Sequence, residues 1–154
     1  RSQVMTSKLL AALASLTITN LVIWVTTFTA LSIFRGARAY DTGTLLLLLG
    51  SIVIFQLFFL SVGLVISLLV KRVRSVTPYA LGLGFGAYVL SAFSGVFGDV
   101  TLELLTPFKH LDAAYMVNNA AYDIPLLLLN LGVSVVALAL SYWLYLRRDI
   151  PSVS

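Results

Sequence analysis

Four long apolar runs, separated by short polar or charged stretches, divide the chain. They cover about residues 9–34, 45–70, 76–97 and 124–146, and none contains Asp, Glu, Lys, Arg or His. At about 1.5 Å of rise per residue, about 20 helical residues cross a hydrocarbon core of about 30 Å, so each run can form a transmembrane helix. The pattern predicts an all-α, polytopic membrane protein in which residues 1–154 form a single transmembrane domain.

The connector at residues 98–123 has a mixed pattern that the other connectors lack. Charged or titratable residues alternate there with apolar ones, and they are Asp99, Glu103, Lys109, His110, Asp112 and Asp123. The apolar residues among them suffice for one or two short helices lying at the membrane surface. Asp123, with Pro125 two residues later, marks the start of the last span, because proline fits the first turn of a helix.

The composition agrees with a membrane protein and argues against some classes of partner. Hydrophobic residues make up 60% of the chain and charged residues 10%, whereas soluble domains have about 25% charged residues. The formal net charge is +4, but the basic residues stand at span ends, where membrane topology places them, so no nucleic-acid partner is expected. The absence of cysteine excludes disulfides and thiolate metal sites.

The basic residues also predict the orientation of the chain. Seven of them fall at one side of the membrane if both termini share that side, namely Arg1, Lys8, Lys71, Arg72, Arg74, Arg147 and Arg148. The other side then has three, Arg35, Arg38 and Lys109. The positive-inside rule therefore predicts cytoplasmic N- and C-termini and an external connector at residues 98–123. The basic cytoplasmic edge is a candidate contact surface for lipid phosphate.

Polar side chains within the first two spans are the candidates for a substrate path. Along the first span they recur at helical spacing, and with the single amide of the second span they are Ser15, Thr19, Asn20, Thr26, Thr27 and Gln56. We favour structural hydrogen bonds between helices, which contribute about 0.6 kcal/mol each in membranes. The alternative is a substrate path or a dimer interface, for which Asn20 is the best candidate because an unpaired amide in lipid is costly.

The third span is rich in small residues. Gly82 and Gly86 form a GxxxG pair, and Ala80 and Gly84 form a second pair with the same spacing. Such pairs let two helix backbones approach closely, so this span is predicted to pack tightly against another helix.

The sequence lacks the residues that several kinds of protein chemistry need. His110 and Asp112 are the closest approach to a catalytic pair, but with no cysteine and no second histidine neither a metal site nor an acid–base site is expected. The spans hold no charge of the kind that proton-driven carriers use. No lysine follows a glycine, so there is no Walker A loop for ATP. The chain is therefore expected to be neither an enzyme nor a cofactor carrier, and uphill transport would need energy from another subunit.

A family resemblance rests on short motifs at both ends. TPFKHLDAAYMV at residues 106–117, a leucine-rich span, and YLRRDI at residues 145–150 resemble the C-terminal end of ABC-2 type permeases. RSQVMTSKLLAAL at residues 1–13 is similar to the segment that follows the cytoplasmic coupling loop of that family. Members of the family usually have six spans and this sequence shows four, so either two spans that would precede Arg1 have been cut away or the resemblance is to a shortened relative.

The resemblance implies a membrane subunit of a transporter in the cell membrane, with short re-entrant or interfacial helices before the last span. It also implies a dimer with a second permease copy or homologue, and cytoplasmic ATPase subunits that bind ATP near the basic edge. The transported substrate is left open. The alternative function is a four-span membrane scaffold or assembly subunit that transports nothing.

Overall fold

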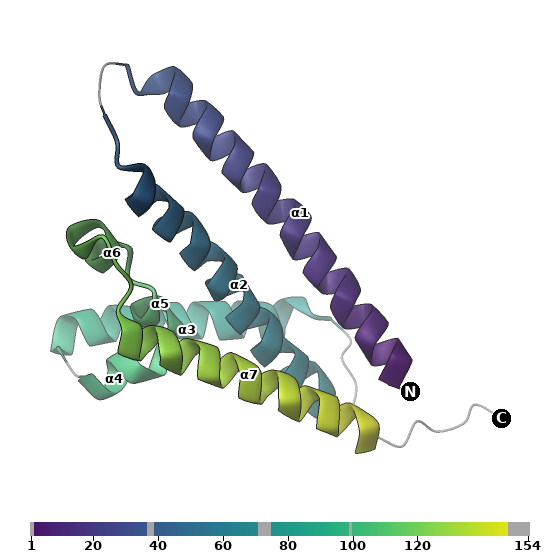
Figure 1. Ribbon diagram of the computed structural model, residues 1–154. Coiled ribbons are helices and arrows are strands. Elements are labelled where there is room, and N and C mark those ends of the chain that lie inside the picture. Colours follow the sequence, from purple (N-terminus) through teal and green to yellow (C-terminus); the bar gives the residue numbers. More distant parts are fainter. Residues whose placement is uncertain (1, 37–38, 71–74, 99, 148–154) are drawn as a thin grey trace.

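The computed structural model describes residues 2–36, 39–70, 75–98 and 100–147, and the regular structure in these ranges is helical throughout. Four helices are long and apolar enough to cross a membrane (Figure 1): α1 (Ser2–Phe34), α2 (Thr42–Leu69), α3 (Thr77–Phe97) and α7 (Ile124–Arg147). Three short helices lie between α3 and α7: α4 (Val100–Leu105), α5 (Pro107–His110) and α6 (Ala113–Asn119). The predicted all-α, membrane-embedded fold with four spans is confirmed.

The ends of the helices differ from the ends of the apolar runs, because capping residues and the absence of helix breakers also decide where a helix begins. Helix α1 begins at Ser2, before the apolar run, because nothing from there to Lys8 interrupts a helix. Helix α2 begins at Thr42 because the Asp41 carboxylate accepts hydrogen bonds from the backbone N–H groups of Gly43 and Thr44, at 3.3 and 2.8 Å.

The connector contains three short helices, where one or two were predicted. Proline is favoured in the first turn of a helix, and Pro107 follows Thr106, so α5 starts there, separately from α4. Asp112 caps α6, its carboxylate accepting from the N–H of Ala114 at 2.8 Å. Each short helix therefore has its own local start signal.

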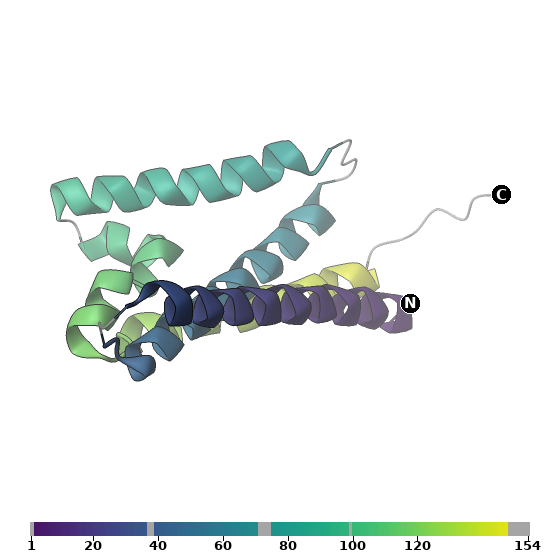
Figure 2. The same cartoon turned by 90° about the horizontal axis from the view of Figure 1, so that it is seen from above.

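The long helices form an open arrangement rather than a closed bundle. Helices α2 and α7 make the most extensive helix–helix contact, and α1 lies against both of them. Helix α3 is on the far side from α1 and is joined to the others largely through α4 and α5 (Figure 2). The first turn of α1 and the last turn of α7 lie at one end, while α6, the end of α1 and the start of α2 lie at the other (Figure 1).

Helix α7 carries a buried face made mostly of small residues. The buried face of α7 repeats at steps of four and three and consists of Asn130, Ser134, Ala137 and Ser141. The Ser134 and Ser141 hydroxyls donate to carbonyls of their own helix, at 2.8 and 2.9 Å, so these two groups are hidden from lipid. A helix with such a face can approach α2 closely.

The glycines at 82, 84 and 86 of α3 have open space around them in the part of the chain that the structure describes. A Cβ atom added at Gly82, Gly84 or Gly86 has no described atom within 4 Å. The close packing predicted from these glycines is therefore not made by the described part of this chain, and it stays a prediction for contact with another chain.

Candidate functional site

The connector is anchored to the spans by residues 106–110, and the first anchor is Thr106. Its side chain is fully buried, and its hydroxyl donates to the carbonyl of Ala87 on α3, at 3.1 Å. Ala87 is one of the two buried residues of α3, the other being Ser94. Thr106 therefore fixes the connector to the middle of α3, a helix with few buried residues.

Phe108 is the second anchor and joins two spans. Its ring lies 4.8 Å, centroid to centroid, from Phe55 and 6.4 Å from Phe59, both on α2. It also lies 6.1 Å from the ring of Tyr88 on α3, and all three contacts are edge-to-face. This geometry is favourable for aromatic rings, so Phe108 links α2 to α3 through a single side chain.

His110 is the third anchor and reaches α7. It is 4% exposed, its Nε2–H donates to the carbonyl of Leu104 at 2.9 Å, and its Nδ1 faces the amide nitrogen of Asn130 at 3.4 Å. These partners need a neutral ring with its proton on Nε2, so that Nδ1 can accept from the Asn130 amide. Burial lowers the pKa of His110 below its usual value, and the hydrogen bond to Leu104 offsets part of this effect.

Acid is therefore expected to loosen the connector. Because folding lowers the pKa of His110, the unfolded chain binds a proton more readily, so the stabilisation is complete above the ordinary value of 6.5 and is lost as pH falls below it. Thermal unfolding of the purified protein between pH 5 and pH 8 measures this loss. The His110→Gln variant should show a flatter profile below pH 6.5, and an identical profile would contradict the assignment.

A charged rim surrounds these anchors on the outer surface. The Lys109 ammonium lies between the carboxylates of Glu103 and Asp112, at 3.9 and 3.8 Å, beside a hollow of about 160 Å³ that Asp123 also lines. Such exposed pairs contribute typically about 0–1 kcal/mol. Asp112 therefore pairs with Lys109 and caps the start of α6, whereas His110 is buried. The two residues do not form a catalytic pair. Among the described residues, no group of three or more His, Cys, Asp or Glu side chains could hold a metal ion.

Tyr122 ties the end of the connector to α2. Its hydroxyl donates to the carbonyl of Leu47 at 2.7 Å, across 75 residues of sequence. The same oxygen lies over Gly50, where an added Cβ would be 2.7 Å from it. An added Cβ at Gly50 would therefore force the Tyr122 side chain to shift. No signal in the sequence indicated the roles of Gly50, Tyr122, Thr106 and Asn130.

The candidate polar stripe of the first two spans is only partly brought together. The Asn20 amide donates to the Gln56 side-chain oxygen at 2.6 Å, which confirms the structural hydrogen bond between helices for these two residues. Asn20 is 7% exposed. The remaining residues are not joined to this pair: Ser15, Thr19 and Thr26 are exposed and Thr27 is half-buried. The Thr19 and Thr26 hydroxyls donate to carbonyls of their own helix, at 2.9 and 2.7 Å, so the described residues form no continuous polar path along this face.

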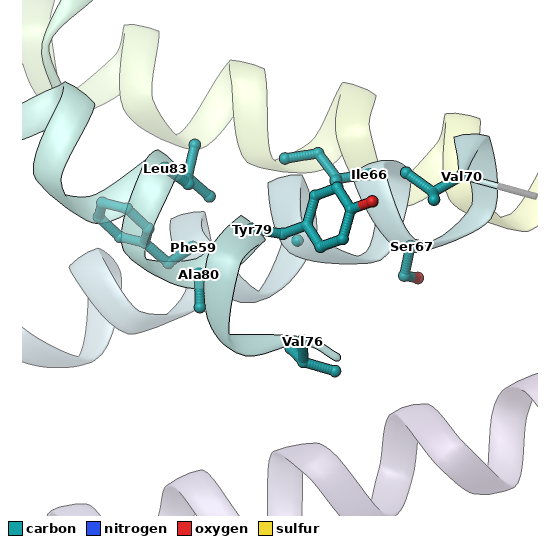
Figure 3. Close-up of a pocket in the computed structure, with 9 residues that line it drawn as sticks. Phe59, Ile66, Ser67, Val70, Val76, Tyr79, Ala80 and Leu83 are labelled. Carbon is teal, nitrogen blue, oxygen red and sulfur yellow. The ribbon is translucent and has the colours of Figure 1, made fainter. Parts of the chain in front are cut away.

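Two hollows flank the α1–α2 contact and the α2–α3 junction. The first, of about 300 Å³, is lined by apolar residues together with Thr17, Asn20 and Trp24. The second, of about 190 Å³, lies between the last turns of α2 and the first turns of α3, with Tyr79 extending toward Ile66 (Figure 3). Its lining is almost wholly apolar, so it suits a hydrocarbon group rather than a polar substrate.

Only part of the basic edge is described. Lys8 lies on α1, and the Arg147 guanidinium is 4.1 Å from the centroid of the Trp143 ring, a cation–π contact. The other residues assigned to this edge lie outside the described residues, and they are Arg1, Lys71, Arg72, Arg74 and Arg148.

No protein-family model, no curated protein and no solved structure matches this chain.

Proposed function

We propose that the chain is the membrane-spanning permease subunit of an ATP-driven, ABC-2 type exporter, working with a second permease copy and a separate cytoplasmic ATPase. The observation that carries this proposal is the connector before the last span. Three short helices fold back there and are anchored by Thr106, Phe108 and His110 to α3, α2 and α7. Short helices in this place are what the resemblance of residues 106–117 implies.

The charges support a partner as the source of energy. The four spans carry no Asp, Glu, Lys, Arg or His between residues 9–34, 45–70, 76–97 and 124–146, so no evident group in them couples to an ion gradient. The chain also lacks a Walker A lysine. A conformational cycle must then be driven by differential binding of a partner at the basic, cytoplasmic edge.

The anchors suggest how such a drive would be transmitted. Residues 106–110 contact α2 and α3 near the middle of each helix, at Phe55 and Ala87, and they contact α7 at Asn130. A partner that displaces the basic ends would tilt the spans about this joint, which is a hinge motion of rigid helices.

The proposal is tested by reconstituting the protein in vesicles with the ATPase that co-purifies with it. Export of a candidate substrate is compared between the wild-type complex, a complex whose ATPase lacks its Walker lysine, and the membrane chain alone. Transport is expected in the first case and its loss in the other two, with folding intact. Undiminished uphill transport without ATP hydrolysis would overturn the proposal.

The alternative, a four-span scaffold, is favoured by one observation. Asn20 and Gln56, the strongest candidates for a substrate path, bond to each other. A scaffold predicts that no ATPase co-purifies and that no vesicle preparation transports, so the same experiment separates the two functions.

A further inference from the structure

A small cavity lies where three spans meet at the basic end of the molecule. It has a volume of about 140 Å³ and is lined by α1, α2 and α7. Leu9 and Ala12 come from α1, and Leu64 and Leu68 come from α2. Residues three or four apart share one helix face, so these apolar side chains form a continuous floor.

The rim of this cavity differs from its floor. Three polar residues also line the cavity, Lys8, Ser67 and Tyr145, and we refer to them as the rim. Lys8 makes no ion pair with any carboxylate of the described residues. Its position just before the apolar run 9–34 lets the stem lie along apolar surface while the ammonium reaches the headgroup layer. Tyr145 lines the same cavity and belongs to the aromatic residues at the end of the last span, which suit headgroup depth.

The hydroxyl groups at the rim are not equivalent. The Ser67 hydroxyl donates to the carbonyl of Leu64 at 2.8 Å, so its proton is already used. The rim therefore offers two donors, the Lys8 ammonium and the Tyr145 hydroxyl, above an apolar floor. This combination matches a phosphate group that carries a hydrocarbon chain.

We propose that this cavity binds an anionic phospholipid, with one acyl chain on the floor and the phosphate held by Lys8 and Tyr145. Charge favours an anionic lipid, because the chain has a formal net charge of +4 and most of its basic residues stand at this end by sequence. A zwitterionic lipid carries its own cation beside the phosphate, so it gains less binding energy from these basic residues. The inference does not rest on the transport function, because it concerns a lipid site in the resting protein.

The experiment measures lipid bound to the detergent-purified protein by native mass spectrometry. Phosphatidylglycerol and phosphatidylcholine with identical acyl chains are titrated separately. We expect preferential binding of phosphatidylglycerol, and a loss of affinity of about fivefold in Lys8→Gln, the factor that one cationic side chain contributes near an anionic surface. Tyr145→Phe should also weaken binding, by a smaller factor.

Two further variants make the test specific. Arg35→Gln removes the same charge, but Arg35 lies over Tyr40 and does not line the cavity, so phosphatidylglycerol binding should be kept. Ala12→Phe fills the floor and should reduce binding of both lipids. Equal losses in Lys8→Gln and Arg35→Gln, or unchanged binding in a folded Ala12→Phe protein, would overturn the proposal; if Ala12→Phe does not fold, the Lys8 and Arg35 comparison alone decides.

Discussion

Replacing Phe108 with alanine is expected to detach the connector from two spans at once and to lower the free energy of unfolding by about 3 kcal/mol, near the lower end for buried Phe→Ala changes. The ring is only half-buried, but it is the shared partner of Phe55 and Phe59 on α2 and of Tyr88 on α3. Removing it leaves three aromatic rings facing an empty space that the short α5 helix is too small to fill. Unfolding in mixed micelles with increasing SDS measures the change.

Phe93→Ala provides the matched control for Phe108→Ala. Phe93 is exposed, and its ring is stacked on Phe97 of the same helix, 6.0 Å away. Its removal changes no contact between elements, so stability should change by less than about 0.5 kcal/mol. If the two variants unfold alike, Phe108 does not anchor the connector.

Gly50→Ala is expected to destabilise the protein by about 2–4 kcal/mol. The new Cβ would lie 2.7 Å from the Tyr122 hydroxyl oxygen, so that side chain must move. It can move only by giving up its hydrogen bond to the Leu47 carbonyl. Overpacking of this kind costs about 1–3 kcal/mol and a lost hydrogen bond about 0.5–1.5 kcal/mol.

Two companion variants test whether the clash involves the hydroxyl alone. Gly63 lies on the same helix with no described atom within 4 Å of an added Cβ, so Gly63→Ala should be neutral or slightly stabilising. Tyr122→Phe removes the single atom that the new Cβ meets, so Gly50→Ala should cost less in that background. Strictly additive losses would show that the close approach is not the cause.

The spans could be predicted from the sequence because the interactions that define a transmembrane helix lie between residues close together in the chain. A run of about 20 apolar residues satisfies its own backbone hydrogen bonds and needs no partner to be recognised. The caps at Asp41 and Asp123 are local for the same reason, since each carboxylate accepts from backbone groups two or three residues away. The predicted bounds and the structure therefore differ mainly at α1, where the helix begins well before the apolar run.

The anchors of the connector could not be predicted, because each depends on a residue distant in sequence. Thr106 meets Ala87 across 19 residues, and His110 meets Asn130 across 20. No periodicity within residues 98–123 indicates these partners. The segment TPFKH carried a family resemblance, but the physical reason for its residue types is visible only when α2, α3 and α7 are placed around it.

The helix that supplies the close packing within this chain could not be predicted for a related reason. Small residues permit close packing but do not require it, so Gly82 and Gly86 and the serine-bearing face of α7 gave equally valid signals. Ser134 and Ser141 hide their hydroxyls within α7 and lie in its buried face, while the α3 glycines meet open space. Which of the two helices packs closely within this chain depends on how the helices are arranged in space, and the sequence pattern carries no information on that arrangement.

Helix α1 has a consequence for how this protein can change over evolutionary time. Among its described side chains only Met5 and Asn20 are buried, so the fold of this chain constrains these two positions of the 33-residue helix most strongly. At exposed positions such as Ile18 and Val25, any apolar residue that favours a helix serves equally well. Strong selection for one residue type at such an exposed position would therefore mark the contact surface of a partner rather than a requirement of the fold.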